Sequence, residues 1–224
     1  MKESKKSEDP NIDKEFVAED VLKETRILVG NGDGSEYVLQ PWLSEEIGLK
    51  VEKLSGIILK RREDGNFDSL LGKGQFGKFY VVLKKKSKSN SNSEGEEICG
   101  MKVIVGNLEE NTIEAKMQRD LTLGIPIGQE SRLMPIFDVI EEKDSSGKLV
   151  RLNLVMPLAS FGNVDSLREN LELEKDIELK RLINKSIAQD LLIGIWQMHC
   201  QNYYHLDIKL ENMVVTSQGK KKIF

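Results

Sequence analysis

The chain has 224 residues, of which 39% are hydrophobic, and this share is enough to build the core of one large domain or two small ones. The 33 basic and 37 acidic residues nearly cancel to a net charge of −4, so no global basic field indicates nucleic-acid binding. We therefore expect no nucleic acid among the partners of this protein.

Cysteine usage and the apolar runs bear on the compartment. Cys99 and Cys200 lie far apart without metal-like spacing, and so few cysteines make a disulfide framework unusual in a chain of this size, which favours a reducing compartment. The charged N-terminus lacks an apolar signal core, and the longest apolar run, Leu191 to Trp196, is far shorter than a membrane span. We expect no membrane span and a cytoplasmic protein, in the host cytosol if the chain is a secreted effector.

The first 65 residues form a tail and an extension. Residues 1–14 hold Lys, Glu, Ser and Asp with almost nothing to bury, so we expect them to be disordered. In the extension, residues 15–65, the apolar runs Ile27 to Val29 and Tyr37 to Leu39 flank a Gly-Asn-Gly-Asp-Gly cluster, which predicts a hairpin leading into a loop. We interpret the extension as a segment that packs on the domain that follows.

The next part of the chain is rich in strands. Residues 67–83 predict a strand, a glycine turn and a second strand. The Lys-, Ser- and Glu-rich run that follows, 84–97, is most simply a solvated loop, because its basic half is followed by an acidic half. We expect the later elements of this half over the following ranges: a strand at 98–105, a helix at 109–121, and a hairpin with strands at 134–141 and 150–156.

The last part of the chain is helical, and the boundary falls near 158–162. A short helix is predicted at 167–170 and the longest helix at 178–202. Apolar residues recur along the long helix at three-to-four spacing, which predicts one stripe facing the core. The predicted stripe consists of Leu182, Ile183, Ile187, Leu191, Ile195, Trp196 and Met198.

A glycine-rich turn carries the first chemical signal. Gly72, Gly74 and Gly77 form a GxGxxG pattern between two strands, and alone this pattern is weak because glycines permit tight turns in many hairpins. A dinucleotide-binding fold requires a helix directly after the glycines, whereas residues 78–83 are strand-like. The context therefore excludes the dinucleotide-binding interpretation.

Residues further along the chain strengthen the signal. Lys102 is a charged residue inside an apolar strand, which is unfavourable without an anionic partner. Glu114 on the following helix is the expected partner, although Glu109 and Glu110 compete for this role and Glu114 could be a solvated carboxylate. Past the long helix, Asp207 is followed by Lys209 and Asn212 in the sequence Tyr-His-Leu-Asp-Ile-Lys-Leu-Glu-Asn.

This ordered set resembles eukaryotic-type Ser/Thr protein kinases over roughly residues 67–224. The resemblance implies an α+β, bilobal protein kinase-like fold, with an antiparallel β N-lobe containing one helix and a partial helical C-lobe. It assigns 66–158 to the N-lobe and 159–224 to the C-lobe. The implied activity is transfer of a phosphoryl group from ATP, with Mg²⁺, to hydroxyls of a protein substrate, and a regulatory protein partner is also expected.

The resemblance implies roles for the phosphate-binding residues. The three glycines would let backbone N–H groups approach the ATP phosphates, with Lys73, Gln75 and Phe76 in the same turn. Lys102 would hold the α- and β-phosphates while paired with Glu114.

The catalytic and base-binding residues follow from the same resemblance. Asp207 would accept or orient the proton of the substrate hydroxyl, Lys209 would neutralise charge on the transferring group, and Asn212 would bind Mg²⁺. The residues expected around adenine and ribose are Phe79, Gly100, Met156, Leu158, Asn163 and Val214.

Three positions depart from the family pattern. Two of them lie near the expected adenine site, and the third lies beside the expected catalytic Asp. Phe79 and Gly100 stand where the family usually has Val and Ala, and the exchange roughly conserves volume, so we expect Phe79 to fill the space over Gly100. Leu206 replaces the Arg that commonly precedes the catalytic Asp and pairs with a phosphorylated activation loop. Leu cannot make such a bond, so we expect activity that is independent of activation-loop phosphorylation.

The end of the sequence resembles the family strand that precedes Asp-Phe-Gly, so we expect a kinase domain truncated just before that motif. Three explanations compete: a piece of a longer kinase, a pseudokinase or partner-binding module that binds nucleotide without efficient catalysis, and a minimal bacterial effector-type kinase that needs a partner. Small-molecule phosphotransferases are a further enzyme class, but they typically lack the glycine pattern and the Lys at 209. Asp207 followed by Lys209 favours Ser/Thr over Tyr as the acceptor.

Overall fold

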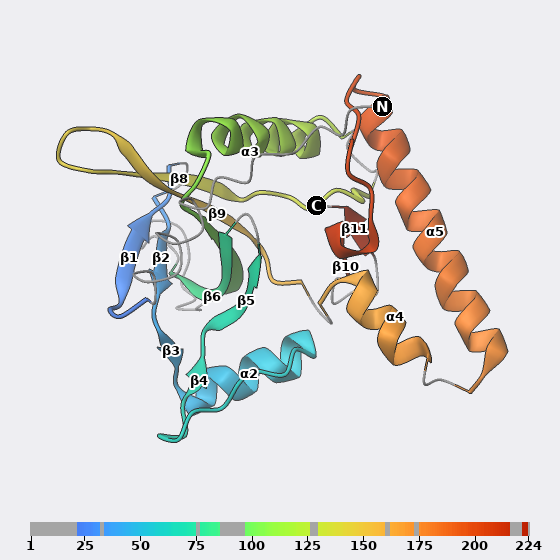
Figure 1. Cartoon of the computed structure of the whole chain (residues 1–224), viewed down its shortest axis with the longest axis horizontal. Helices are drawn as coiled ribbons and strands as arrows, with labels where there is room; N and C mark the ends of the chain where they lie inside the picture. Colours follow the sequence, from blue (N-terminus) through green and yellow to red (C-terminus); the bar gives the residue numbers. More distant parts are fainter. Residues whose placement is uncertain are drawn as a thin grey trace, which may run out of the picture.

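The computed structural model describes residues 22–31, 34–74, 77–85, 97–125, 130–159, 162–172, 175–215 and 221–223. The predicted tail at 1–14, Gln75, Phe76 and most of the run 84–97 lie outside these ranges. The chain forms a sheet lobe followed by a helical lobe, which Figure 1 shows side by side. This order of an antiparallel sheet and then helices confirms the predicted α+β class.

A seven-stranded antiparallel sheet forms the sheet lobe. Its order is β1-β2-β6-β7-β9-β8, and β5 pairs with β6 off this path. The strands are β1 (Arg26–Val29), β2 (Glu36–Leu39), β5 (Leu70–Gly74), β6 (Gly77–Lys85), β7 (Glu97–Ile104), β8 (Asp138–Lys143) and β9 (Leu149–Pro157). The predicted strands on both sides of the glycine turn and the predicted hairpin of β8 and β9 are confirmed, although β8 begins four residues later than expected.

The hairpin predicted in the extension is also present, and it belongs to the main sheet. β1 pairs with β2, and β2 pairs with the C-terminal part of β6. The turn after β1 reaches the opposite edge strand, where the backbone N–H of Asn31 donates to Asp138 Oδ1 at 3.1 Å and the Tyr37 hydroxyl donates to Asp138 Oδ2 at 3.4 Å. A Cβ at Gly30 would lie 2.1 Å from Asp138 Oδ2, so the contact requires glycine. The hairpin therefore joins both edges of the sheet.

Between the hairpin and the glycine turn lies helix α2 (Glu45–Ser55), where the sequence predicted a loop. The Ser44 side chain caps its first turn by accepting from the Ile47 N–H, and Gly56 ends it in a left-handed conformation with φ of 67°. A Cβ at Gly48 would lie 2.1 Å from the Phe67 ring, so the helix packs closely against Phe67. Phe67 lies in β4 (Phe67–Asp68), which pairs with β3 (Trp42–Leu43).

Helix α3 (Leu108–Leu123) lies along one face of the sheet, close to its predicted bounds. Its buried Ala115 packs in an apolar cluster with residues of β7 and β9, including Ile104, Leu152, Leu154 and Met156. This packing holds α3 beside β7 and β9.

The helical lobe contains α4 (Val164–Glu172), α5 (Ile177–His199), a 3₁₀ turn at Leu210–Asn212, β10 (Met213–Val215) and β11 (Lys221–Ile223). The Asp176 side chain caps α5 by accepting from the N–H groups of Glu178 and Leu179. No helix in the described ranges is both long and apolar enough to cross a bilayer.

The predicted core stripe of α5 is wrong at two positions. Ile187, Leu191, Ile195 and Met198 pack against neighbouring elements, whereas Leu182 is 64% and Trp196 is 55% exposed. At 100° per residue Trp196 lies opposite Ile187, and Leu182 lies nearly as far round the helix. The apolar stripe predicted for α5 is therefore wider than the face of α5 that packs against other elements.

A set of long-range polar contacts, which we call the clasp, joins the end of α3 and the loop after it to α5 and the turn that follows α5. The Arg132 Nε lies 2.6 Å from Asp190 Oδ1, and both side chains are nearly buried. Gln197 accepts from the Arg132 backbone N–H at 2.8 Å and donates to the Glu130 carbonyl at 2.9 Å. Gln201 donates to the carbonyl of Leu121 at 3.0 Å. The clasp links the sheet lobe to the helical lobe.

Candidate functional site

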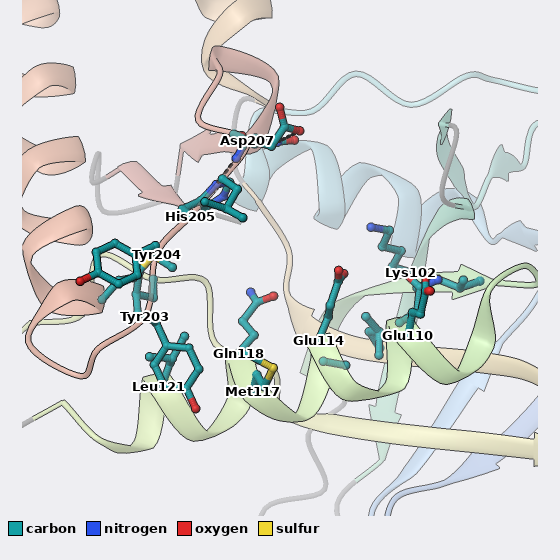
Figure 2. A pocket seen from close by; sticks show the side chains of 18 of the residues that line it. Lys102, Glu110, Glu114, Met117, Gln118, Leu121, Tyr203, Tyr204, His205 and Asp207 are labelled. Carbon is teal, nitrogen blue, oxygen red and sulfur yellow. Dashed lines mark hydrogen bonds between the residues drawn. The ribbon is translucent and has the colours of Figure 1, made fainter. Parts of the chain in front are cut away.

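A cleft of about 620 Å³ lies between β7, α3 and the segment 203–212. Figure 2 shows side chains from α3 and from this segment facing each other across it. The cleft brings together four residues that the sequence predicted for one site, namely Lys102, Glu114, Asp207 and Asn212. Since these residues are up to 110 positions apart in the chain, their convergence is a property of the fold.

Lys102 enters the cleft from the middle of the sheet. Lys102 lies on β7, and its register partners on the two neighbouring strands are Phe79 of β6 and Leu154 of β9. Burial lowers the pKa of its ammonium group, and the charge of Glu114 raises it in the opposite direction. An ammonium group in this setting favours anions such as phosphate.

Glu114 is the carboxylate whose charge acts on Lys102. Helix α3 directs Glu110 and Glu114 into the cleft, with Glu114 beside Lys102 in Figure 2. Gln118 follows one helical turn later and donates to the Met134 carbonyl at 2.9 Å. Sequence reasoning did not single out Gln118, although its spacing of four residues from Glu114 puts it on the same helix face.

The segment after α5 orients Asp207. Lys209 Nζ lies 2.7 Å from Asp207 Oδ2, and the Asn212 Nδ2 donates to the same oxygen at 3.0 Å and to the Asp207 carbonyl at 2.9 Å. The backbone N–H of Asp207 donates to His205 Nδ1 at 3.1 Å. The bond from Lys209 lowers the pKa of Asp207, and that bond in turn raises the pKa of Lys209. Asp207 is thus an ionised, exposed carboxylate held in one orientation.

The oxygens of this segment are suited to a hard cation. The Asn212 amide nitrogen faces Asp207, so its amide oxygen points to a different side of the group. Amide and carboxylate oxygens are the ligands that Mg²⁺ prefers, usually together with waters and phosphate oxygens of a bound nucleotide. Among the described residues no three His, Cys, Asp or Glu side chains gather as a metal site. The Asn212 amide oxygen is the group of this segment that would hold a Mg²⁺ ion.

The glycine turn has room beside two of its glycines. A Cβ at Gly72 or Gly74 would meet no atom within 4 Å, whereas at Gly77 it would lie 2.2 Å from the Val103 carbonyl oxygen. Gly77 also has a φ of 137°, which a residue with a side chain rarely adopts. Lys73 between them is exposed, and Gln75 and Phe76 lie outside the described residues.

The residues predicted around adenine and ribose are not among those that line this cleft, and they lie in or beside two apolar clusters of the sheet lobe. Met156 is fully buried in the cluster beneath α3, and Val214 of the helical lobe packs against the same cluster. Asn163 forms an isolated bridge with Val214, and its side-chain oxygen accepts from the Ser166 N–H at 2.8 Å, which caps α4. Leu158 packs with the cluster around α2. The predicted contact of Phe79 with Gly100 is present.

The inner part of the cleft contains residues that sequence reasoning did not predict. They come from α3, the loop after it, α5 and the segment that follows α5: Met117, Leu121, Leu133, Met198, Tyr203 and Tyr204. Only the fold brings these apolar and aromatic side chains together, because no short motif contains them.

Comparison with known proteins gives distant relatives and no matching family model. A dual serine/threonine and tyrosine protein kinase of Mus musculus is 25% identical over 178 residues, which are 79% of this chain and 17% of the relative. A protein of the same name from Danio rerio is 27% identical over 154 residues, 68% of this chain and 15% of the relative. A serine/threonine-protein kinase of Candida albicans is 27% identical over 173 residues, 74% of this chain and 21% of the relative.

Over most of its length the chain is similar to protein kinases at 25–27% identity. It spans about a sixth of the length of the first of these curated relatives. The antiparallel sheet with its one long helix agrees with the N-lobe of this fold, so the predicted fold class is confirmed.

Proposed function

We propose that the chain is a protein kinase domain that binds ATP with Mg²⁺ and transfers a phosphoryl group to Ser or Thr hydroxyls of a protein. The observation that supports this most strongly is the single cleft shared by Lys102, Glu114, Asp207 and Asn212. A cation beside a carboxylate, facing a fixed second carboxylate, provides both a phosphate contact and a proton acceptor. The similarity of the chain to protein kinases supports the same function.

The proposed reaction is an in-line displacement at the γ-phosphorus. The substrate hydroxyl oxygen forms a bond to phosphorus while the bond to the β,γ-bridging oxygen breaks, and ADP leaves. Asp207 takes the hydroxyl proton, and Lys209 offsets negative charge on the transferring group. Mg²⁺ bound with the nucleotide would supply electrostatic stabilisation of the phosphate oxygens, with the Asn212 amide oxygen as a ligand.

Substrate and partner are proposed on narrower grounds. Lys209 two residues after Asp207 favours Ser or Thr as acceptor by resemblance. Leu206 beside Asp207 is 96% exposed and carries no charge, which supports activity without a phosphorylated activation loop and leaves regulation to a protein partner. The free thiols of Cys99 and Cys200 suit a reducing, cytoplasmic setting.

A second function is nucleotide binding without efficient transfer. It requires the cleft with Lys102 and Glu114, and it does not require the transfer chemistry proposed for Asp207 and Lys209. The two functions share ATP binding and differ in catalysis, so one pair of experiments separates them.

The test combines a thermal-shift titration with Mg²⁺ and ATP and a ³²P transfer assay on a general protein substrate. We expect Lys102→Met to weaken ATP binding, and Asp207→Asn to retain binding while lowering transfer about 10²–10⁴-fold. Lys148→Met, in the exposed turn between β8 and β9, is the matched control for loss of a lysine charge.

Each outcome decides between the functions. Binding with transfer that Asp207→Asn abolishes supports the kinase. Binding without transfer supports the second function. Absence of any ATP-induced shift contradicts both functions.

A further inference from the structure

Three exposed aliphatic side chains belong to one short part of the extension, helix α2 and the turn that follows it. Leu54 is 60% exposed, Ile58 is 92% exposed, and Leu49 is exposed as well. Figure 1 shows α2 at the end of the sheet lobe that is remote from α3. A single exposed aliphatic side chain is common on protein surfaces, whereas three of them on one short element form an apolar surface that requires an explanation.

The turn after α2 holds Ile58 in this exposed position. Ile57 and Leu59 on either side of it pack into the apolar cluster beneath α2, so the side chain of Ile58 points away from that cluster. The Ile57 N–H donates to Ser55 Oγ at 3.2 Å. The Leu59 N–H donates to Glu52 Oε1 at 2.8 Å. Side chains of α2 therefore fix the backbone on both sides of Ile58.

Lysines lie between the exposed leucines of α2. At about 100° per residue, a sector of about 140° contains Leu49, Lys53, Lys50 and Leu54 in this order. All four residues are exposed, and the buried residues of α2 lie on the opposite side, against the apolar cluster. We call this sector of α2, together with Ile58, the outer face.

Positive charge predominates on the outer face. Residues 45–62 include five basic and three acidic residues. Two of the carboxylates have partners within the extension, since Glu45 pairs with Arg61 and Glu52 accepts a backbone N–H of the turn. The third, Glu46, stands against the two lysines of the outer face. The surface therefore combines aliphatic side chains with an excess of ammonium groups.

We propose that the outer face binds the surface of a membrane that contains anionic lipids. Ile58 and Leu54 insert at the boundary between headgroups and acyl chains, and the two lysines meet the anionic headgroups while their methylene stems lie along the apolar layer. A protein partner would need a hollow for a side chain as exposed as Ile58, whereas a lipid interface closes around it. This attachment is peripheral, and it does not depend on the proposed nucleotide binding.

The test is co-sedimentation of the full chain with two kinds of vesicle. One is phosphatidylcholine alone, and the other is phosphatidylcholine with phosphatidylserine at about three to one. We expect the wild type to bind the mixed vesicles about ten-fold or more tightly than the neutral vesicles, because the lysines gain from anionic headgroups.

Ile58→Ser tests the insertion. It should weaken binding to the mixed vesicles about ten-fold, because it removes the most exposed aliphatic group from the apolar layer. Ile113→Ser, at an exposed isoleucine of α3, is the matched control and should leave binding unchanged. Thermal unfolding of both variants verifies that they fold.

Lys50→Gln combined with Lys53→Gln tests the headgroup contact. Each lysine at an anionic surface contributes about five-fold in affinity, so this variant should bind the mixed vesicles about twenty-five-fold less tightly. Its weak binding to neutral vesicles should not change. Lys148→Gln combined with Lys185→Gln removes the same charge from exposed positions elsewhere and should have a much smaller effect.

Ile58→Trp reports the insertion directly, because tryptophan is favoured at a membrane interface. The fluorescence that it adds to the wild-type emission of Trp42 and Trp196 should shift to the blue on mixed vesicles. Lipids with brominated acyl chains should quench it. Ile113→Trp should show neither effect.

Three outcomes overturn the inference. Wild type that stays in the supernatant with mixed vesicles overturns it and assigns the outer face to a protein partner. Loss of binding in the lysine variant without any loss in Ile58→Ser overturns it too, because electrostatic attraction without insertion then explains the binding. Equal losses in Ile58→Ser and Ile113→Ser place the contact outside the outer face. These measurements contain no nucleotide, so their failure leaves the proposed function untouched.

Discussion

At the scale of single residues, Lys102 carries a conflict between stability and binding. Burial lowers the pKa of its ammonium group, and the nearby charge of Glu114 only partly offsets this effect. A group whose pKa is lowered by folding destabilises the folded chain at neutral pH, and this penalty disappears as the pH rises toward the ordinary lysine value. The sequence retains an unfavourable charge inside a strand, which indicates a functional reason.

We therefore predict that Lys102→Met raises the melting temperature of the ligand-free chain at pH 7 while weakening ATP binding. Methionine fills a similar volume and brings no charge into the sheet. Differential scanning calorimetry at pH 7 and pH 10 provides the measurement, and the difference between variant and wild type should shrink at the higher pH. A lower melting temperature of the variant at both pH values would contradict the prediction.

The pair of Asp207 and Lys209 leads to a second prediction. The bond from Lys209 lowers the pKa of Asp207, so the carboxylate stays ionised to a lower pH than usual. Lys209→Met should return the pKa of Asp207 upward toward its ordinary value, which an NMR titration of the carboxyl carbon can follow. Lys185→Met on the exposed surface of α5 is the control. Because Asp207 is ionised at pH 7 in both cases, lost transfer in Lys209→Met would report lost charge and not protonation.

At the scale of elements, the contact between the β1–β2 turn and β8 is open to a direct test. Gly30→Ala places a methyl group against Asp138 Oδ2, so the turn must move from the edge strand and the buried carboxylate loses its N–H donor. We predict destabilisation of about 1–3 kcal/mol, measured by urea unfolding. Gly106→Ala is the matched control, since its Cβ would meet no atom within 4 Å. Equal stability of both variants would show that the turn is not anchored there.

The elements differ in how far the sequence predicts them. Alternating apolar residues and turn glycines locate the strands of the sheet, and the hairpin at β1 and β2 is correct for the same reason. Helix α2 was missed although Ser44, two following glutamates and Gly56 form an ordinary start and stop pattern. Its apolar positions are few, and its burial depends on Phe67 from a distant strand. Such a helix is recognised by its caps more readily than by its periodicity.

The residues of the candidate site also differ in how far the sequence predicts them. Short motifs point to Lys102 and Asp207 because each is a chemical group in an unusual local setting. The inner side of the cleft, with Gln118 and Tyr203, depends on how α3 faces the segment after α5, and no local pattern contains that information. The seating of Phe79 on Gly100 follows from volume alone, since a large residue and a missing side chain complement each other.

At the scale of the whole molecule, the clasp between loop and α5 decides how the two lobes are held. Arg132→Met would leave Asp190, which is 8% exposed, as a buried carboxylate without its guanidinium. We predict a loss of about 3 kcal/mol in unfolding free energy, because removing one partner of a buried ion pair leaves the other charge buried without compensation. The double variant Arg132→Met with Asp190→Leu should recover much of this loss. Chemical unfolding of the four proteins completes the cycle, and additive losses would contradict a direct pair.

The position of β6 has a consequence for the unfolding of the molecule. This strand pairs with β7 along one edge, and with β5 and then β2 along the other. One strand therefore carries the glycine turn at its start, Phe79 near it, and the extension at its end. Separating the extension would expose the backbone amides of the same strand that supports the proposed nucleotide site.

Amide hydrogen exchange makes this consequence measurable. We predict that amides of β2 and of the middle of β6 exchange through one common opening, with equal free energy and equal dependence on denaturant. A nucleotide bound at the glycine turn should then slow exchange in β2 as well, although β2 does not touch the cleft. Exchange of β2 through a separate, lower-energy opening would instead make the extension an independent unit. If the prediction holds, the extension and the strand beside the proposed site open and close together in one event.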